Sequence, residues 1–409
     1  MKNKRDIQEL GGVEIADVYK GAELAAHLIR TKEGVRFEYT PEYLASNAPQ
    51  IAHTLPKSSE PQLVSAGGVP SFFAGLLPEG RRLYALQRAI KTSADDELSL
   101  VLAVGHDVVG DVRVVPSGDA PSSVAPLVEV RRSFEEIKFS DLLSEFAEID
   151  KVGLPGVQEK VSAKRISLPA SRAGSQFILK LESSEYPYVI ENEDYFLGIA
   201  RKSLKAVVQT ELVHDCEGKS GLLVTRFDRT LDATGNPISI AVEDSCQFLN
   251  RWPADKYNIS TETIVAELSK VCASPKLATR ELYRQFCFAW FTGNGDLHAK
   301  NISILSTQDG EWEISPAYDL PSTLPYGDTS LALTLGGKKT GHSRKSLIEF
   351  GMTVGLSEKL ATKVLDEILD STAQVIEDLR EGCLPFDQQK ISDSVAVLRH
   401  RRRTGSLTQ

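Results

Sequence analysis

Residues 293–301 read Gly-Asn-Gly-Asp-Leu-His-Ala-Lys-Asn, and residues 315–320 read Ser-Pro-Ala-Tyr-Asp-Leu. Each stretch is a short polar loop beside apolar segments, and we expect the residues after Asn301 to form a short buried strand. Asp296, Asn301 and Asp319 therefore stand at the edges of apolar elements. The spacing Asp-x-x-x-x-Asn, followed about 18 residues later by a second Asp, is typical of phosphoryl-transfer enzymes.

In such enzymes one Asp positions the attacking hydroxyl, and an Asn and a second Asp hold Mg²⁺ on the nucleotide phosphates. The alternative is a polar turn in which Asn and Gly supply positive φ and the Asp residues cap neighbouring elements. Asp296 and Asn301 alone leave the two interpretations about equally supported. Asp319 and two features upstream favour phosphoryl transfer.

The first upstream feature is a lysine inside an apolar strand. Residues 177–181 (Phe-Ile-Leu-Lys-Leu) predict a short strand that contains Lys180, and burying an ammonium is costly unless it is paired or bound to an anion. Residues 189–204 predict a helix with Glu193 on its apolar stripe. A strand Lys paired with a helix Glu holds the nucleotide phosphates in protein kinases. The alternative is an edge strand with Lys180 in water and a Glu193 that reaches solvent.

The second feature is a glycine-containing loop, Gly-Leu-Pro-Gly-Val-Gln-Glu-Lys at residues 153–160. Gly153 and Gly156 would let backbone N–H groups approach a polyphosphate, and Lys160 would add positive charge. The loop matches neither G-x-x-x-x-G-K-[ST] nor G-x-G-x-x-G, so an ordinary hairpin turn is the alternative.

Composition narrows the class of protein. A chain of 409 residues predicts roughly two or three domains, and a net charge of −9 disfavours nucleic-acid binding by the chain as a whole. The five cysteines are scattered without a C-x-x-C pair, which argues against zinc and against a disulfide framework. We find neither a long apolar run nor a secretory signal, and we expect a cytoplasmic protein without membrane contact. The basic run at residues 399–403 is interpreted as a solvated tail, and the alternative is a binding patch.

The order of predicted elements divides the chain into three parts. A loop rich in Ser, Pro, Gly and Asp at residues 116–126 suggests a boundary. We predict an N-terminal subdomain over residues 1–125, a β-rich lobe with the glycine loop and Lys180 over 126–242, and a helical lobe with the two polar loops over 243–409.

Several further motifs follow one another along almost the whole chain. In the first part they are Tyr-Thr-Pro-Glu-Tyr-Leu-Ala at 39–45, Phe-Phe-Ala-Gly-Leu-Leu-Pro at 72–78 and Gly-His-Asp-Val-Val-Gly-Asp at 105–111. In the second part they are Gly-Val-Gln-Glu-Lys at 156–160, Phe-Asp-Arg at 227–229, Glu-Asp-Ser-Cys-Gln at 243–247 and Lys-Tyr at 256–257. Together with the two polar loops, and in this order, these motifs resemble the HipA-type serine/threonine kinases, toxins of bacterial toxin–antitoxin pairs.

The resemblance implies an α+β, two-lobed protein-kinase-like fold with a small N-terminal α/β subdomain and a helix-rich C-terminal lobe. It implies ATP and Mg²⁺, with Asp296 as the catalytic Asp, Asn301 and Asp319 as metal ligands and Lys180 as the nucleotide lysine. Lys300 would neutralise charge on the transferring group, and backbone groups of Thr225 and Phe227 would meet adenine. The full set of nucleotide-site candidates is Gly153, Gly156, Val157, Gln158, Lys160, Lys180, Glu193, Thr225, Phe227, Asp228 and His298.

The resemblance also implies partners. The best-known substrates of the family are aminoacyl-tRNA synthetases, whose phosphorylation blocks charging and halts growth. Its usual partner is a small DNA-binding helix-turn-helix antitoxin, so that contact with DNA would be indirect.

The sequence departs from the family at two places. Well-studied members phosphorylate their own Ser just before the glycine loop, whereas this chain has Gly153 there, which puts inhibitory autophosphorylation in doubt. Ser162 is an alternative acceptor, although an ordinary strand residue is the better interpretation. Thr225 stands where an acidic residue is common, which changes a side chain and not the backbone contact.

Two other functions fit part of the same evidence. A small-molecule kinase of similar build uses a related Asp, Asn and Asp set. A non-catalytic kinase fold would only sequester a partner or act as a co-repressor with it. The presence of Lys180, Asp296, Asn301 and Asp319 argues against the non-catalytic alternative.

Overall fold

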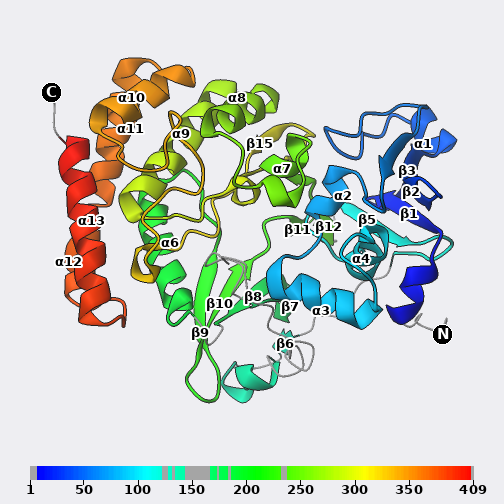
Figure 1. Cartoon of the computed structure of the whole chain (residues 1–409), viewed down its shortest axis with the longest axis horizontal. Coiled ribbons are helices and arrows are strands. Elements are labelled where there is room, and N and C mark those ends of the chain that lie inside the picture. Colours follow the sequence, from blue (N-terminus) through cyan, green and yellow to red (C-terminus); the bar gives the residue numbers. More distant parts are fainter. Residues whose placement is uncertain are drawn as a thin grey trace. The chain divides into compact units, whose positions relative to one another are not determined.

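The computed structural model describes residues 7–121, 128–130, 134–142, 166–172, 175–182, 186–231 and 237–406 (Figure 1). The chain forms two compact units. The first contains the segments 1–126, 140–158 and 228–254, and the second contains 127–139, 159–227 and 255–409. Within the described ranges, no helix is both long enough and apolar enough to cross a membrane.

The first unit is built on an antiparallel five-stranded sheet with the strand order β4-β3-β2-β1-β5. The sequence patterns of residues 13–19, 35–39 and 109–115 predict strands, and the structure confirms them as β1, β3 and β5. The sequence did not predict β2 and β4. The bounds are β1 (Ile15–Lys20), β2 (Glu23–Arg30), β3 (Gly34–Tyr39), β4 (Gln62–Ser65) and β5 (Val112–Pro116).

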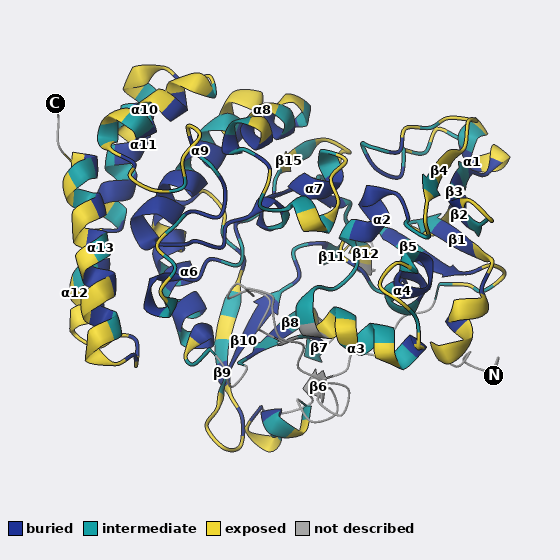
Figure 2. Ribbon diagram, viewed as in Figure 1, coloured by how far each residue is buried: buried dark blue, intermediate teal, exposed yellow. Residues whose placement is uncertain are grey.

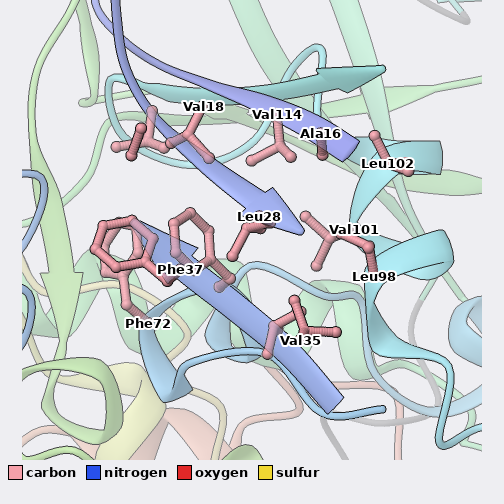
Figure 3. Close-up of a cluster of buried hydrophobic side chains, with 14 of the residues drawn as sticks. Ala16, Val18, Leu28, Val35, Phe37, Phe72, Leu98, Val101, Leu102 and Val114 are labelled. Carbon is pink, nitrogen blue, oxygen red and sulfur yellow. The ribbon is translucent and has the colours of Figure 1, made fainter. Parts of the chain in front are cut away.

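Short helices bury one face of this sheet. Figure 3 shows Leu28 and Phe37 of the sheet gathered with Phe72 of α2 and Leu98 of α4. Each fully buried side chain of this kind contributes roughly 1.5–3 kcal/mol. The helices are α1 (Pro41–Ala45), α2 (Ser71–Gly75), α3 (Gly80–Ile90) and α4 (Glu97–Val104).

The segment 228–254 joins the first unit through buried polar contacts. Glu243 is almost fully buried and accepts hydrogen bonds from the backbone N–H of His53 (3.0 Å) and from its Nδ1 (2.8 Å). The Gln247 amide donates to the carbonyl of Phe72 at 2.8 Å. The elements of this segment are β11 (Arg229–Leu231), β12 (Pro237–Ser239), β13 (Val242–Asp244) and α7 (Ser245–Phe248).

The second unit begins with a sheet of order β6-β7-β8-β10-β9, in which only the β6–β7 pair is parallel. Lys180 pairs with Leu222 in the register of β8 and β10, so it lies in an interior strand and not on an edge strand. The helix predicted over 189–204 is confirmed as α6. The bounds are β6 (Val128–Val130), β7 (Ile166–Arg172), β8 (Ser175–Leu181), α6 (Val189–Ser203), β9 (Thr210–His214) and β10 (Ser220–Thr225).

The rest of the second unit is helical around α9, whose C-terminal half is buried almost throughout (Figure 2). The sequence of residues 357–379 predicts one continuous helix, but the structure interrupts it between Ser371 and Val375. The predicted strand after Asn301 is confirmed as part of a hairpin. The bounds are α8 (Thr261–Val271), α9 (Pro275–Thr292), β14 (Ser303–Ser306), β15 (Trp312–Ile314), α10 (Arg344–Thr353), α11 (Glu358–Ser371), α12 (Val375–Arg380) and α13 (Gln388–Ser406).

The interpretation of residues 399–403 as a solvated tail was wrong. They belong to α13, and Arg401 is only 3% exposed. Its Nη1 donates to the carbonyl of Trp290 at 2.6 Å, which ties α13 to the end of α9. The helical phase of the run turns this arginine inward and leaves Arg399 and His400 exposed.

Candidate active site

Two glycines shape the loop that follows α9. Gly293 ends the helix with φ of 73°, and a Cβ there would come within 2.4 Å of the Leu324 side chain. A Cβ on Gly295 would come within 2.6 Å of both Thr323 Oγ1 and the Ser330 carbonyl. The loop can therefore fold against residues 322–330 only with glycine at these positions.

Asp296 is fixed by its own backbone. Its N–H donates to Asn294 Oδ1 at 2.8 Å, and its carbonyl accepts from the N–H of His298 at 2.8 Å and from Asn301 Nδ2 at 3.0 Å. Asp296 is fully buried, and a carboxylate at such a position must be satisfied by polar groups. The Tyr257 hydroxyl lies 3.5 Å from its Oδ1, at the outer limit of a hydrogen bond.

Tyr318 joins the two polar loops. Its hydroxyl donates to the carbonyl of Lys300 at 2.8 Å and accepts from Ser303 Oγ at 2.6 Å. Asp319 follows with φ of 59°, a left-handed conformation that is uncommon for a residue other than glycine and that clusters at functional sites. The backbone thus turns sharply at Asp319, the second aspartate of the predicted site.

Lys180 connects the sheet, α6 and the second loop. Its Nζ lies 2.6 Å from Glu193 Oε1 and 2.9 Å from Asp319 Oδ1. The Glu193 side chain is 1% exposed, and those of Lys180 and Asp319 are 12% and 16% exposed. The strand lysine and the helix glutamate therefore form the ion pair that the apolar patterns suggested, and Asp319 joins them.

A second link runs beside this pair. Asn192 Nδ2 donates to the carbonyl of Ser322, and the N–H of Ser322 donates back to Asn192 Oδ1, both at 2.9 Å. Thr323 Oγ1 accepts from the N–H of Gly295 at 3.0 Å. Residues 319–323 are thus anchored to α6 on one side and to the loop of Asp296 on the other.

The segment after β10 supplies the adenine candidates. The N–H of Thr225 donates to the carbonyl of Gln209 at 2.9 Å, so only its carbonyl is left for a ligand. Among the described residues, none makes a hydrogen bond with the backbone of Phe227, whose ring packs on Tyr318 with 5.6 Å between centroids. Asp228 belongs to the first unit, where its carboxylate accepts from the N–H of Gly110 and from Arg229.

The remaining predicted residues are placed less closely. His298 is buried with its ring against Tyr257, at 5.2 Å between centroids. Lys300 is half-buried in the loop of Asp296. The predicted glycine loop and Ser162 lie outside the described residues. The roles assigned from the sequence to Gly153, Gly156, Val157, Gln158, Lys160 and Ser162 therefore stay predictions.

Several residues of this site were not singled out individually from the sequence. The motifs at 256–257 and 315–320 included Tyr257 and Tyr318, and the opening loop included Asn294, but none of the three was given a role. Asn192 gave a signal that was overlooked: an amide on the buried face of a helix, next to Glu193, requires a polar partner.

Asn301 and Asp319 suit a magnesium ion. Mg²⁺ takes one or two protein oxygens and completes its shell with phosphate oxygens and water. Because Asn301 Nδ2 donates to the Asp296 carbonyl, its Oδ1 is left as an available ligand, and Asp319 adds a carboxylate. The described residues contain no cluster of three or more His, Cys, Asp or Glu side chains that would suit a metal held by protein alone.

Comparison with known proteins identifies the family. The HipA-like C-terminal domain model matches residues 152–376, and the HipA N-terminal domain model matches residues 16–115. This chain belongs to the HipA family. It is a kinase of the HipA type, with the two-lobed α+β fold of that family.

Individual relatives agree over most of their length. The Sinorhizobium fredii proteins Y4dM and Y4mE, both named as candidate kinases, are 31% and 28% identical, over 80% and 94% of this chain and 80% and 97% of their own. The serine/threonine-protein kinase toxin HipA of Shewanella oneidensis is 26% identical over 88% of each chain. A solved complex of Shewanella oneidensis HipA with HipB and operator DNA matches with a TM-score of 0.73 and 20% identity, over 95% of this chain and 96% of that one.

Proposed function

We propose that this chain is an ATP-dependent serine/threonine-protein kinase that acts as the toxin of a toxin–antitoxin pair. The observation that carries the catalytic part is the position of Lys180, which bridges Glu193 and Asp319. Protein kinases need a strand lysine paired with a helix glutamate, together with a metal-binding aspartate, for phosphoryl transfer.

In the proposed reaction a Ser or Thr hydroxyl of the substrate attacks the γ-phosphorus of ATP. The new O–P bond forms as the bond to the β–γ bridging oxygen breaks, ADP leaves, and Asp296 accepts the hydroxyl proton. Lys180 holds the nucleotide phosphates, and Lys300 offsets charge on the transferring group. Asn301 and Asp319 would hold Mg²⁺, which neutralises phosphate charge when bound.

Because Asp296 is buried, a substrate hydroxyl must gain access to its carboxylate. The Tyr257 hydroxyl stands 3.5 Å from its carboxylate, about where an incoming substrate hydroxyl would be placed. We therefore infer that Tyr257 gives way when a substrate binds. The backbone contacts of Asp296 would hold the carboxylate in position during that exchange.

The test is transfer of radiolabelled phosphate from ATP to proteins of a cell extract by purified wild type and Asp296→Asn. We expect the variant to lose at least about 10³-fold in rate, because the hydroxyl loses its proton acceptor while the fold is retained. Asp309→Asn, an exposed substitution in the turn between β14 and β15, is the matched control. Full activity of Asp296→Asn would refute the assignment, and labelling of metabolites without labelled protein would indicate a small-molecule kinase.

The partners follow from the relatives. We propose that the chain binds a small DNA-binding antitoxin and reaches DNA only through it, because the matching structure contains HipB and operator DNA. We further propose a component of translation, such as an aminoacyl-tRNA synthetase, as the substrate, and the cytoplasm as the place of action. Co-expression with the protein encoded next to this chain tests the first point: we expect one complex in size-exclusion chromatography, and separate elution would contradict it.

A further inference from the structure

A cavity in the second unit lies at the end of α9, away from the residues assigned to catalysis. Its volume is about 440 Å³, within the range of small-molecule sites. It is bounded by Trp290, by the segment before α10 and by α13. The lining residues are Trp290, Thr329, Thr340, Gly341, His342, Ser343, Ala396, Val397, His400, Arg401 and Thr404.

The lining carries a positive charge without a counter-ion. It contains Arg401 and two histidines and no Asp or Glu, although the chain has a net charge of −9. Arg401 donates to the carbonyls of Trp290 and Thr329, and its guanidinium lies 3.9 Å from the centroid of the Trp290 ring. Among the described residues, no carboxylate lies within ion-pair distance of it; Asp328 acts only from farther away. Burial lowers the pKa of Arg401 to about 10.

Two further polar groups in this lining have no partner. Trp290 Nε1 and His342 Nε2 are buried and make no hydrogen bond within the described part of the chain, and each residue is 3% exposed. The other ring nitrogen of His342 donates to the carbonyl of Lys338. Buried polar groups are nearly always satisfied, so an unpartnered donor and acceptor beside an unneutralised guanidinium indicate a missing ligand.

The N-terminus of α10 adds to the same potential. Ser343 is its N-cap and lines the cavity, and the first turn of a helix carries partial positive charge. The cavity thus combines a cation, an indole N–H and a helix N-terminus with hydroxyl groups of threonine. The guanidinium, the indole N–H and the helix N-terminus complement an anion.

We propose that this cavity binds a small organic anion, a metabolite that carries a phosphate or carboxylate group. The anionic group would face Arg401 and Trp290 Nε1, and a hydroxyl of the ligand would donate to His342 Nε2. The site is separate from the nucleotide site. It is connected to the helix that precedes the loop of Asp296, because Arg401 donates to the carbonyl of Trp290 in the last turn of α9.

The test uses the full-length chain carrying Lys180→Met. Phosphate bound at the nucleotide lysine then adds nothing to the binding signal, and the result does not depend on kinase activity. Inorganic phosphate and citrate are titrated, with KCl at equal ionic strength as the blank, while calorimetry and tryptophan fluorescence are followed. We expect saturable binding of at least one anion. Arg401→Gln should weaken it by about tenfold or more, since a charge-assisted contact is lost.

His342→Asn is the second variant, because an asparagine amide can keep the bond to the Lys338 carbonyl while the group at Nε2 is removed. We expect binding several-fold weaker, with unfolding temperature little changed; this variant decides the matter if Arg401→Gln fails to fold. Arg399→Gln, on the exposed face of α13, should bind like the parent. Absence of saturable binding, or binding unaffected by His342→Asn and by a folded Arg401→Gln, would overturn the proposal.

Discussion

Two cations of the second unit, the half-buried Lys180 and the buried Arg401, are satisfied in opposite ways. Lys180 has two carboxylates within 2.9 Å, whereas Arg401 has none and rests on two carbonyls and an indole ring. We call Lys180, Glu193 and Asp319 the first cluster, and Arg401 with Trp290 the second cluster. The three charges of the first cluster sum to −1, whereas the second cluster carries the single positive charge of Arg401. Excess negative charge suits a metal ion brought with a nucleotide, and excess positive charge suits an anion.

Between the two cations, the larger expected effect comes from removing Lys180. Lys180→Met should lower the rate of phosphoryl transfer by about 10²–10³-fold, equivalent to about 3–4 kcal/mol, because the nucleotide phosphates lose their ammonium. Single-turnover kinetics measure this loss. Lys270→Met, an exposed lysine on α8, is the control and should be near wild type. A loss confined to KM, at unchanged kcat, would mean that Lys180 only binds nucleotide.

Removing the unpaired cation should act on stability instead. We expect Arg401→Met to lower the free energy of unfolding by about 2–4 kcal/mol, because the carbonyls of Trp290 and Thr329 lose their donors. Chemical denaturation measures the change. The kinase rate per folded molecule should fall much less than in Lys180→Met. If both substitutions cost the same in rate and in stability, the proposed division between the two clusters is wrong.

A smaller effect should come from the link beside the first cluster. Asn192→Ala removes both hydrogen bonds to Ser322 and leaves a buried carbonyl and N–H unsatisfied, at a cost of about 1–3 kcal/mol of unfolding free energy. Because residues 319–323 lose an anchor, we also expect a several-fold lower kcat. Thr372→Ala, which removes a buried hydrogen bond to the carbonyl of Ile368 at the end of α11, serves as a control for stability alone. An unchanged kcat would show that Asn192 does not position Asp319.

The sequence could predict the first cluster because each of its parts has a local signature. An apolar strand with one lysine, and a helix stripe with one glutamate, each require a partner, and the polar loops carry a recognisable spacing. The contacts of Tyr318 and Asn192 could not be predicted, since they depend on segments about 15 and 130 residues apart coming together. The strand β2 was missed because Ala25 and Ala26 favour helix, and packing in the sheet overrides that preference.

The second cluster was missed for a different reason. A run of charged residues at the end of a chain is usually solvated, and nothing in its composition marks one arginine as buried. Arg401 is buried because the face of α13 that carries it packs against Trp290, and this orientation depends on tertiary packing. Its charge excess therefore became visible only with the fold.

The smallest expected effect concerns the pH dependence of stability through His342. Burial is the main cause that lowers the pKa of His342 below its usual 6.5, and the charges of Arg401 and Lys338 act in the same direction. The hydrogen bond with the backbone of Lys338 and the charge of Glu262 oppose this lowering. Below that pH the unfolded chain binds a proton that the folded chain refuses, so His342 makes stability fall as pH decreases and has no effect well above 6.5. We expect His342→Asn to give a shallower fall, with a difference of at most about 1.4 kcal/mol per pH unit for one proton. Denaturation series at several pH values, with exposed His400→Asn as control, measure the two slopes. Equal slopes in wild type and His342→Asn would mean that the fold does not lower the pKa of His342.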